Sequence, residues 1–130
     1  MDKTIYLLIG PMGAGKTTYA HQKAADFGAI VLSKDAFNKL SPEELVYPLI
    51  VNYFASQGVN IILDSLHLRR QDRDPMRNIA RKYGYRLKYI QIYPWRALSP
   101  LSDRMFSSFE RPARDEFDEI EDVFGKDQTT

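Results

Sequence analysis

The sequence predicts an α/β fold in which helices flank an open sheet of four parallel strands, in the order 2-3-1-4. Two observations carry this prediction. Short apolar runs of strand length alternate with segments whose apolar residues recur at helical spacing, as expected for strands joined by right-handed helical crossovers. The first apolar run also leads into a glycine-containing loop at the start of a helix, an arrangement that binds phosphate groups. We expect one domain over residues 1–130.

The glycine-containing loop is residues 10–17, which match the phosphate-loop (P-loop) pattern G-x-x-x-x-G-K-[ST] at every fixed position. Residues 4–9 form the apolar strand before it, and Ala20, Ala24 and Phe27 mark the helix after it. Glycines let successive backbone N–H groups point inward, and the helix start adds a partial positive charge. We therefore expect a nucleoside triphosphate to bind here, held by Gly10, Pro11, Met12, Gly13, Ala14, Gly15, Lys16, Thr17 and Thr18.

Two oxygen-bearing side chains are candidates for a Mg²⁺ site beside the phosphates. The Thr17 hydroxyl can take one position on the ion, while Lys16 reaches the β- and γ-phosphates. Asp64 ends the apolar run 59–64 and so has the position of the second carboxylate of phosphate-loop proteins. The alternative role of Asp64 is to cap the turn that follows it.

Asp35 lies just beyond a second expected strand, residues 29–32, which follows a helix stop at Gly28. Ligands of open α/β sheets bind at the carboxyl ends of the strands, so we expect Asp35 to face the same crevice as the phosphate loop. Its alternative role is to cap the turn at residues 36–39.

Two further helices are expected before and after the third strand. The first begins at a capping box, residues 41–44, and runs to Gly58, with Pro48 expected to kink or split it. The second begins at Pro75 and ends at Gly84, and its basic residues are expected on a solvated face. His67 lies close to both the strand and the second helix, but a histidine with no visible partner is more often structural than a substrate contact.

The C-terminal third is expected to supply an edge strand, a lid and a last helix. Residues 85–93 alternate like an edge strand. Residues 96–114 carry arginines among small polar residues, a composition suited to a lid that brings cations to the phosphates and excludes water. Arg104 is the first candidate for that cation and Arg111 the second. The apolar residues at 117, 120, 123 and 124 then have the spacing of an amphipathic helix with an acidic outer face.

Charge is distributed unevenly along the chain, although the net charge is only +1. Residues 66–114 contain 12 Lys and Arg against 4 Asp and Glu, whereas residues 115–130 contain 1 and 7. A basic block next to a phosphate loop is suited to nucleotide or nucleic-acid phosphates. The alternative is that many of these cations are only the solvated faces of helices.

Composition restricts the compartment and excludes a membrane protein. No apolar run approaches the length of about 18 residues that a membrane span needs. The chain has no cysteine, so it has no disulfide framework, and residues 1–9 do not have the pattern of a signal peptide. We expect a cytoplasmic protein with no membrane partner.

Three stretches resemble the bacteriophage polynucleotide 5′-kinase family: residues 10–18, residues 33–35 and residues 61–95. The resemblance implies a P-loop kinase that moves the γ-phosphate of ATP to a 5′-hydroxyl of DNA or RNA. It also implies Asp35 as the general base, Lys16 and Thr17 as phosphate and metal contacts, and an arginine of residues 104–111 as the lid cation.

Departures from this family fall on the acceptor side. Asn38 stands where relatives commonly have arginine, and residues 64–68 read Asp-Ser-Leu-His-Leu where relatives commonly read Asp-Ala-Thr-Asn-Leu. Two other functions therefore stay open: a kinase of a small-molecule hydroxyl, on a nucleoside, nucleotide or sugar, and a nucleotide-binding ATPase module. The absence of a glutamate beside Asp64 that would activate water argues against the ATPase module.

Overall fold

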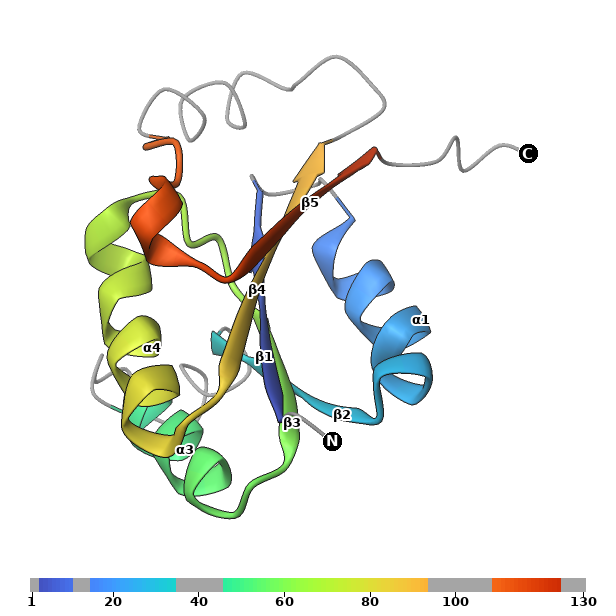
Figure 1. Ribbon diagram of the computed structural model, residues 1–130. Coiled ribbons are helices and arrows are strands. Elements are labelled where there is room, and N and C mark those ends of the chain that lie inside the picture. Colours follow the sequence, from blue (N-terminus) through green and yellow to red (C-terminus); the bar gives the residue numbers. More distant parts are fainter. Residues whose placement is uncertain (1–2, 11–14, 35–45, 94–108, 125–130) are drawn as a thin grey trace.

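The computed structural model describes residues 3–10, 15–34, 46–93 and 109–124. These residues form a parallel sheet of five strands in the order β2-β3-β1-β4-β5, with helices on both faces (Figure 1). The strands are β1 (Thr4–Ile9), β2 (Ala29–Ser33), β3 (Asn60–Asp64), β4 (Arg86–Tyr93) and β5 (Glu119–Phe124). The helices are α1 (Lys16–Phe27), α3 (Val46–Ser56), α4 (Arg70–Tyr83) and the short 3-10 helix η1 (Arg114–Glu116). The α/β fold and the order 2-3-1-4 are thus confirmed, with β5 added at the edge.

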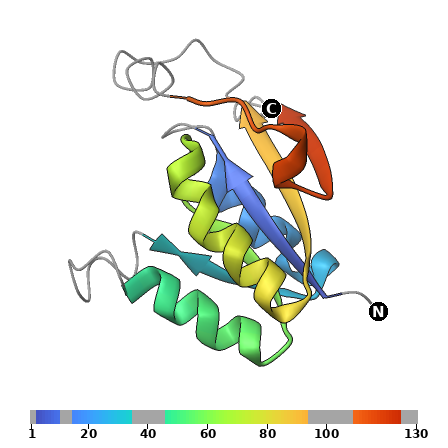
Figure 2. The ribbon, with the colours of Figure 1, turned by 60° about the vertical axis from the view of Figure 1, so that its left-hand side comes forward.

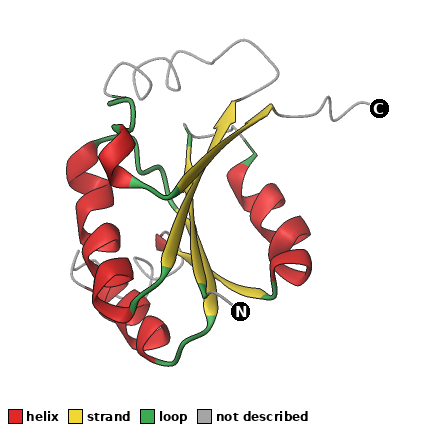
Figure 3. Ribbon diagram, viewed as in Figure 1, coloured by secondary structure: helices red, strands yellow, loops and turns green. Residues whose placement is uncertain are grey.

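The alternation of side chains along β1 gives the sheet a buried core on each face. Leu7 lies in the core that includes residues of α3 and α4, whereas Leu8 lies in the core that includes Ala20 of α1. Helices α3 and α4 lie side by side on one face and α1 covers the other (Figures 2 and 3). Because β1 and β3 are covered on both faces, their sequences are almost continuously apolar.

Helix α1 is bounded at both ends by glycines with left-handed backbone angles. Gly15 has φ 94° and Gly28 has φ 58°, a region that other residues rarely adopt. The Gly28 N–H donates to the carbonyl oxygens of Ala24 and Ala25, which closes the last turn of the helix. The phosphate-loop glycine and the helix stop are therefore both required by the backbone.

The segment 119–124 was expected to be helical and is instead the edge strand β5. It pairs with β4 from Lys88↔Glu119 to Tyr93↔Phe124, so residues 85–93 are not the edge. Lys88 Nζ lies 2.9 Å from a carboxylate oxygen of Glu119, a cross-strand ion pair that supports this register. The strand is exposed at nearly every position, so it lacks the alternation that identifies a half-buried strand.

Pro75 and Pro48 both lie within helices of the described chain. Helix α4 begins at Arg70 rather than at Pro75, which lies inside it. Helix α3 is described from Val46 to Ser56 as one α-helix that contains Pro48, so the described helix is not split there. Residues 41–45, with the expected capping box, lie outside the described residues.

None of the described helices has the length and apolar character needed to cross a membrane.

Candidate active site

A cavity of about 710 Å³ lies among residues that follow the carboxyl ends of β2 and β3 and the residues that begin α1. Gly15, Lys16, Thr17 and Thr18 line it from the start of α1, and Lys34 lines it just after β2. Residues 64–67 line it from the end of β3, and the first turns of α3 and α4 complete the wall. This is the sheet edge at which open α/β proteins bind ligands.

A backbone hydrogen bond joins the described part of the phosphate loop to the loop after β3. The Gly10 N–H donates to the carbonyl oxygen of Leu66 over 3.2 Å, and the Tyr19 N–H donates to the carbonyl of Gly15 over 3.0 Å. Lys16, the first residue of α1, lines the cavity although it is only 9% exposed. The start of α1 thus presents its backbone N–H groups and a lysine to the cavity, which suits a phosphate chain.

Thr17 and Asp64, the two residues predicted to hold Mg²⁺, are in direct contact. The Thr17 hydroxyl donates a hydrogen bond of 2.8 Å to Asp64 Oδ2, and Asp64 is buried at the end of β3. One hydroxyl and one carboxylate are hard oxygen donors, and such a sparse pair fits an ion that keeps waters and phosphate oxygens as its other ligands. No cluster of three or more His, Cys, Asp or Glu that could enclose a metal occurs among the described residues.

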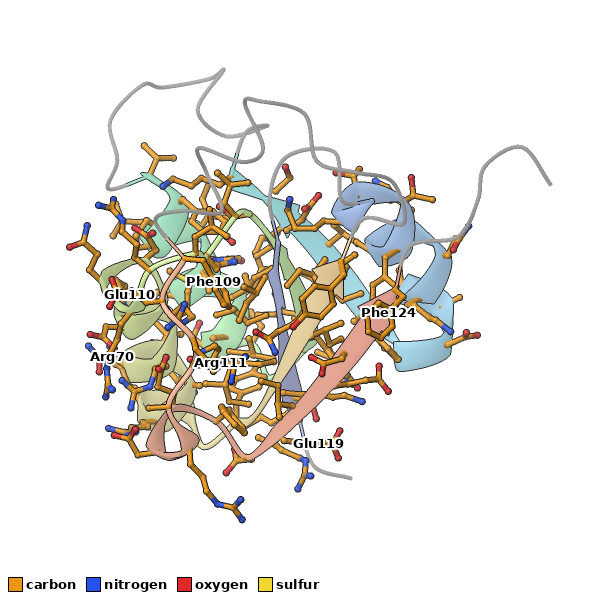
Figure 4. All side chains as sticks on the ribbon, turned by 90° about the horizontal axis from the view of Figure 1, so that it is seen from above. Arg70, Phe109, Glu110, Arg111, Glu119 and Phe124 are labelled. Carbon is orange, nitrogen blue, oxygen red and sulfur yellow. The ribbon has the colours of Figure 1, made fainter. Side chains whose placement is uncertain are left out.

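Several predicted site residues lie outside the described residues: Pro11, Met12, Gly13, Ala14, Asp35 and Arg104. Arg111 is described and is exposed. It lies on the α4 side of the sheet with Phe109 and Glu110 (Figure 4), and it does not line the cavity. Its positive charge counteracts the rise in the pKa of Tyr93, at the end of β4, that burial causes. The lid roles of Arg104 and Arg111 stay predictions.

A buried ion pair that was not predicted from the sequence lies next to the cavity wall. Arg73 is fully buried in α4, and its Nε donates to Glu116 Oε1 over 2.8 Å. The guanidinium also donates to the carbonyl oxygens of His67 and Leu68, each over 3.0 Å. The Ala113 N–H donates to Glu116 Oε2, so the pair joins α4, the loop after β3 and the chain that leads into β5. Arg73 lies three residues before the apolar Met76 on the same helix face, but the helix was expected to begin at Pro75, which left Arg73 outside the predicted core.

Most of the basic block is paired with acidic side chains in the described residues. Arg70 binds Asp115 over 3.1 Å, Arg73 binds Glu116, and Arg86 and Lys88 bind Glu119. Arg77, expected on a solvated face, is buried, and its Nη1 lies 2.6 Å from Asp74. The basic block and the acidic C-terminal segment therefore neutralise each other within the fold.

His67 was expected to be structural or a substrate contact, and it lines the cavity as a buried side chain. Burial lowers the pKa of the imidazole to about 4, although its hydrogen bond to the Leu8 carbonyl counteracts the effect. Tyr47, from α3, is also buried at the cavity, and burial together with the charge of Asp64 raises the pKa of its hydroxyl. Both side chains are therefore neutral at physiological pH.

Comparison with solved structures identifies the fold of this arrangement. The chain superposes on a protein from Chloroflexus aurantiacus described as a putative kinase, with TM-score 0.73 and 16% identity over 95% of this chain and 86% of that one. A fungal RNA kinase gives TM-score 0.69 and 15% identity over 100% of this chain but 40% of the other. The kinase CysC of Mycobacterium tuberculosis, solved in complex with AMPPNP and APS, gives TM-score 0.62 and 13% identity over 93% and 88%. The P-loop kinase fold is confirmed by these likenesses.

Sequence comparison gives the family. No curated protein sequence matches the chain. The family model AAA_33, described as an AAA domain, matches residues 5–99, which include the phosphate loop, Asp64 and the cavity wall between them. The chain belongs to the AAA_33 family of AAA domains.

Proposed function

We propose that the protein is a kinase that moves the γ-phosphate of ATP to a 5′-hydroxyl of DNA or RNA. The observation that carries the transfer itself is the contact between Thr17 and Asp64 at the start of α1, beside Lys16 and open to a cavity. A phosphate loop alone would serve nucleotide binding. The cavity extends from the phosphate loop to the first turns of α3 and α4, which supports a two-substrate reaction.

The residues of the proposed site fall into those that bind ATP, the phosphate donor, and those that act on the acceptor hydroxyl. Residues 10–18 hold the triphosphate, with Lys16 on the β- and γ-phosphates, and Thr17 and Asp64 would hold a Mg²⁺ ion that neutralises phosphate charge. Asp35 follows Lys34 in the chain, and we propose that its carboxylate orients the acceptor hydroxyl and takes its proton as the new P–O bond forms and the bond between the γ-phosphorus and the departing ADP breaks. Arg104, with Arg111 as second candidate, would bring positive charge to the transferred group.

The polynucleotide acceptor is supported by the resemblance to phage polynucleotide 5′-kinases and by the shared fold of a fungal RNA kinase. A small-molecule acceptor is the second candidate, because a cavity of about 710 Å³ has the size of an ordinary small-ligand site. The kinase CysC, of the same fold, was solved with the small molecule APS. A nucleotide-binding ATPase module is the third and least supported candidate.

Labelled ATP distinguishes the three candidates in one experiment. The protein is incubated with γ-labelled ATP and 5′-hydroxyl oligonucleotides of DNA and RNA, nucleosides, nucleotides and sugars, and each acceptor is assayed for label. We expect label on the oligonucleotides. Label on a nucleoside, nucleotide or sugar alone would show the small-molecule kinase, and release of labelled phosphate with no labelled acceptor would show the ATPase. Asp64→Ala, which removes the Thr17 contact, serves as the inactive control.

A further inference from the structure

The imidazole of His67 has one nitrogen in use and one without a partner. Its Nδ1 lies 2.8 Å from the carbonyl oxygen of Leu8, at the end of β1. Its Nε2 is buried and has no hydrogen-bond partner among the described residues. A buried polar atom without a partner is unfavourable, and native proteins carry few of them. Such an atom in the wall of a candidate active site therefore needs an explanation.

The hydrogen bond to Leu8 determines which nitrogen carries the proton. A carbonyl oxygen can only accept, so Nδ1 is the protonated nitrogen. The ring is neutral near pH 7 because burial lowers its pKa to about 4. Nε2 is consequently a bare lone pair, which accepts a hydrogen bond and cannot donate one. Its natural partner is an O–H or N–H group.

The surroundings hold His67 in a conformation that is unfavourable for it. Its φ is 49°, and it is the only described residue other than glycine with positive φ. The guanidinium of Arg73 binds its carbonyl oxygen, and the ring binds β1, so contacts on both sides maintain this conformation. Strained residues held in this way are concentrated at functional sites.

The position of His67 connects it to the proposed reaction. Lys16, Lys34, Tyr47 and Asp72 line the same cavity, and the ring centroids of Tyr47 and His67 are 6.5 Å apart. The charges of Lys16 and Lys34 act on the imidazole. His67 therefore lines the same cavity as the lysine of the phosphate loop and the first turns of α3 and α4.

We propose that His67 determines acceptor specificity, with its Nε2 accepting a hydrogen bond from an O–H or N–H group of the 5′-terminal nucleotide. This inference rests on the proposed kinase function. Because Nε2 is buried, the donor group reaches it only if the cavity wall around His67 shifts on binding. The donor is either the ribose 2′-hydroxyl or an N–H group of the base, and these two sources are separated by experiment. An acceptor that lacks the donor leaves Nε2 unpaired and binds more weakly.

Two variants separate the two nitrogens. In His67→Asn the side-chain amide can replace Nδ1 and keep the bond to Leu8, but it is too short to replace Nε2. Asparagine also tolerates positive φ better than most residues. In His67→Gln the longer amide can replace Nε2 but leaves the Leu8 carbonyl without its donor. If His67 is purely structural, His67→Gln should therefore lower stability more than His67→Asn does. If Nε2 contacts the acceptor, His67→Asn should weaken acceptor binding more than His67→Gln does.

The probes are 5′-hydroxyl oligonucleotides that differ only in the 5′-terminal nucleotide: ribose, deoxyribose and abasic. For the wild type, we expect removal of the true donor group to raise the acceptor KM roughly 10- to 100-fold, with the ATP KM unchanged. An effect of deoxyribose identifies the 2′-hydroxyl, and an effect of the abasic residue alone identifies the base. His67→Asn should raise the acceptor KM by a similar factor and abolish this discrimination, whereas His67→Gln should lower the Tm but retain it.

The outcomes that overturn the proposal are distinct from failure of the proposed function. Wild-type acceptor KM and discrimination in His67→Asn would mean that Nε2 makes no contact with the acceptor. Equal KM values of the wild type for all three probes would also overturn the proposal, even if neither variant folds. If the wild type labels no oligonucleotide, the polynucleotide 5′-kinase function fails, and this inference fails with it. If oligonucleotides are labelled but His67→Asn has no effect, only the inference about His67 is contradicted, and the kinase function is still supported.

Discussion

At the scale of single residues, Lys16 combines a charged head with a nearly buried position. It begins α1 and lines the cavity, where its charge adds to the partial charge of the helix start. Together with Gly15, whose φ of 94° permits the turn into the helix, it makes the strand-to-helix junction suitable for phosphate. These two positions were recognisable from sequence because a single local motif specifies both.

Lys16→Ala should strongly reduce transfer while the fold persists, because the ammonium group stabilises phosphate charge and is not needed for packing. We expect kcat to fall by about 10²–10³-fold, the effect typical of removing one group that stabilises transition-state charge. Circular dichroism and Tm provide the control for folding. Near-native turnover with an unchanged ATP KM would contradict the phosphate-binding role of the loop.

Asp35→Asn tests the proposed base. Asparagine keeps the size and still accepts a hydrogen bond, but it cannot take the proton, so kcat should fall by about 10²–10⁴-fold with little change in ATP affinity. Steady-state kinetics and ATP titration measure the two effects. If the variant loses stability while its folded fraction stays fully active, Asp35 caps a turn, and Asp64 becomes the next candidate for the base.

At the scale of elements, the pair Arg73 and Glu116 joins segments that are distant in sequence. Besides Arg73, Glu116 accepts hydrogen bonds from the Tyr89 hydroxyl in β4 and from the Ala113 backbone, so η1 is fixed against both α4 and β4. Arg73 in turn holds the carbonyls of the loop that supports the phosphate loop. Figure 1 shows η1 beside the beginning of α4, as these contacts require.

Arg73→Met should destabilise the protein strongly, because it leaves the Glu116 carboxylate buried without its cation. Removing one partner of a buried pair typically lowers the free energy of unfolding by about 3–5 kcal/mol. Urea unfolding measures this change. The matched control is Arg81→Met, in the last turn of the same helix, where the side chain is exposed and the expected change is below about 0.5 kcal/mol. Equal effects of the two substitutions would contradict the importance of the buried pair.

The pH dependence of stability gives a second test of Glu116. Burial raises the pKa of its carboxyl, but the hydrogen bonds from Arg73, Ala113 and Tyr89 and the charge of Arg73 outweigh burial, so the net pKa is lowered. A lowered pKa in the folded state means stabilisation that is present above the ordinary glutamate pKa and is lost as the pH falls through the folded value. Glu116→Gln should therefore be less stable than wild type at pH 7, with the difference shrinking below about pH 4. A difference that stays constant between pH 7 and pH 3 would contradict this linkage.

At the scale of the whole molecule, the parts predicted correctly are those encoded by local pattern. Strands β1 and β3, the phosphate loop and the stop of α1 at Gly28 each have a short signal in the sequence. The parts predicted wrongly depend on partners distant in the chain. Strand β5 is specified by pairing with β4, and Arg77 is buried because its guanidinium donates to the Glu116 carbonyl. Periodicity within one segment contains no information on either.

At the same scale, ion pairs within the fold occupy most described cations of the basic block, so few remain to bind a polyanion. Besides Lys16, the described cations that line the cavity are Lys34 and Arg69. Two phosphate contacts correspond to a slope of about −1.4 for the logarithm of oligonucleotide affinity against the logarithm of salt concentration, at about −0.7 per phosphate of a single strand. Lys34→Gln should make the slope shallower by about 0.7, whereas the exposed control Lys82→Gln, at the far end of α4, should leave it unchanged. A wild-type slope near zero would mean that the acceptor carries no phosphate into the site, which favours a small, uncharged hydroxyl substrate.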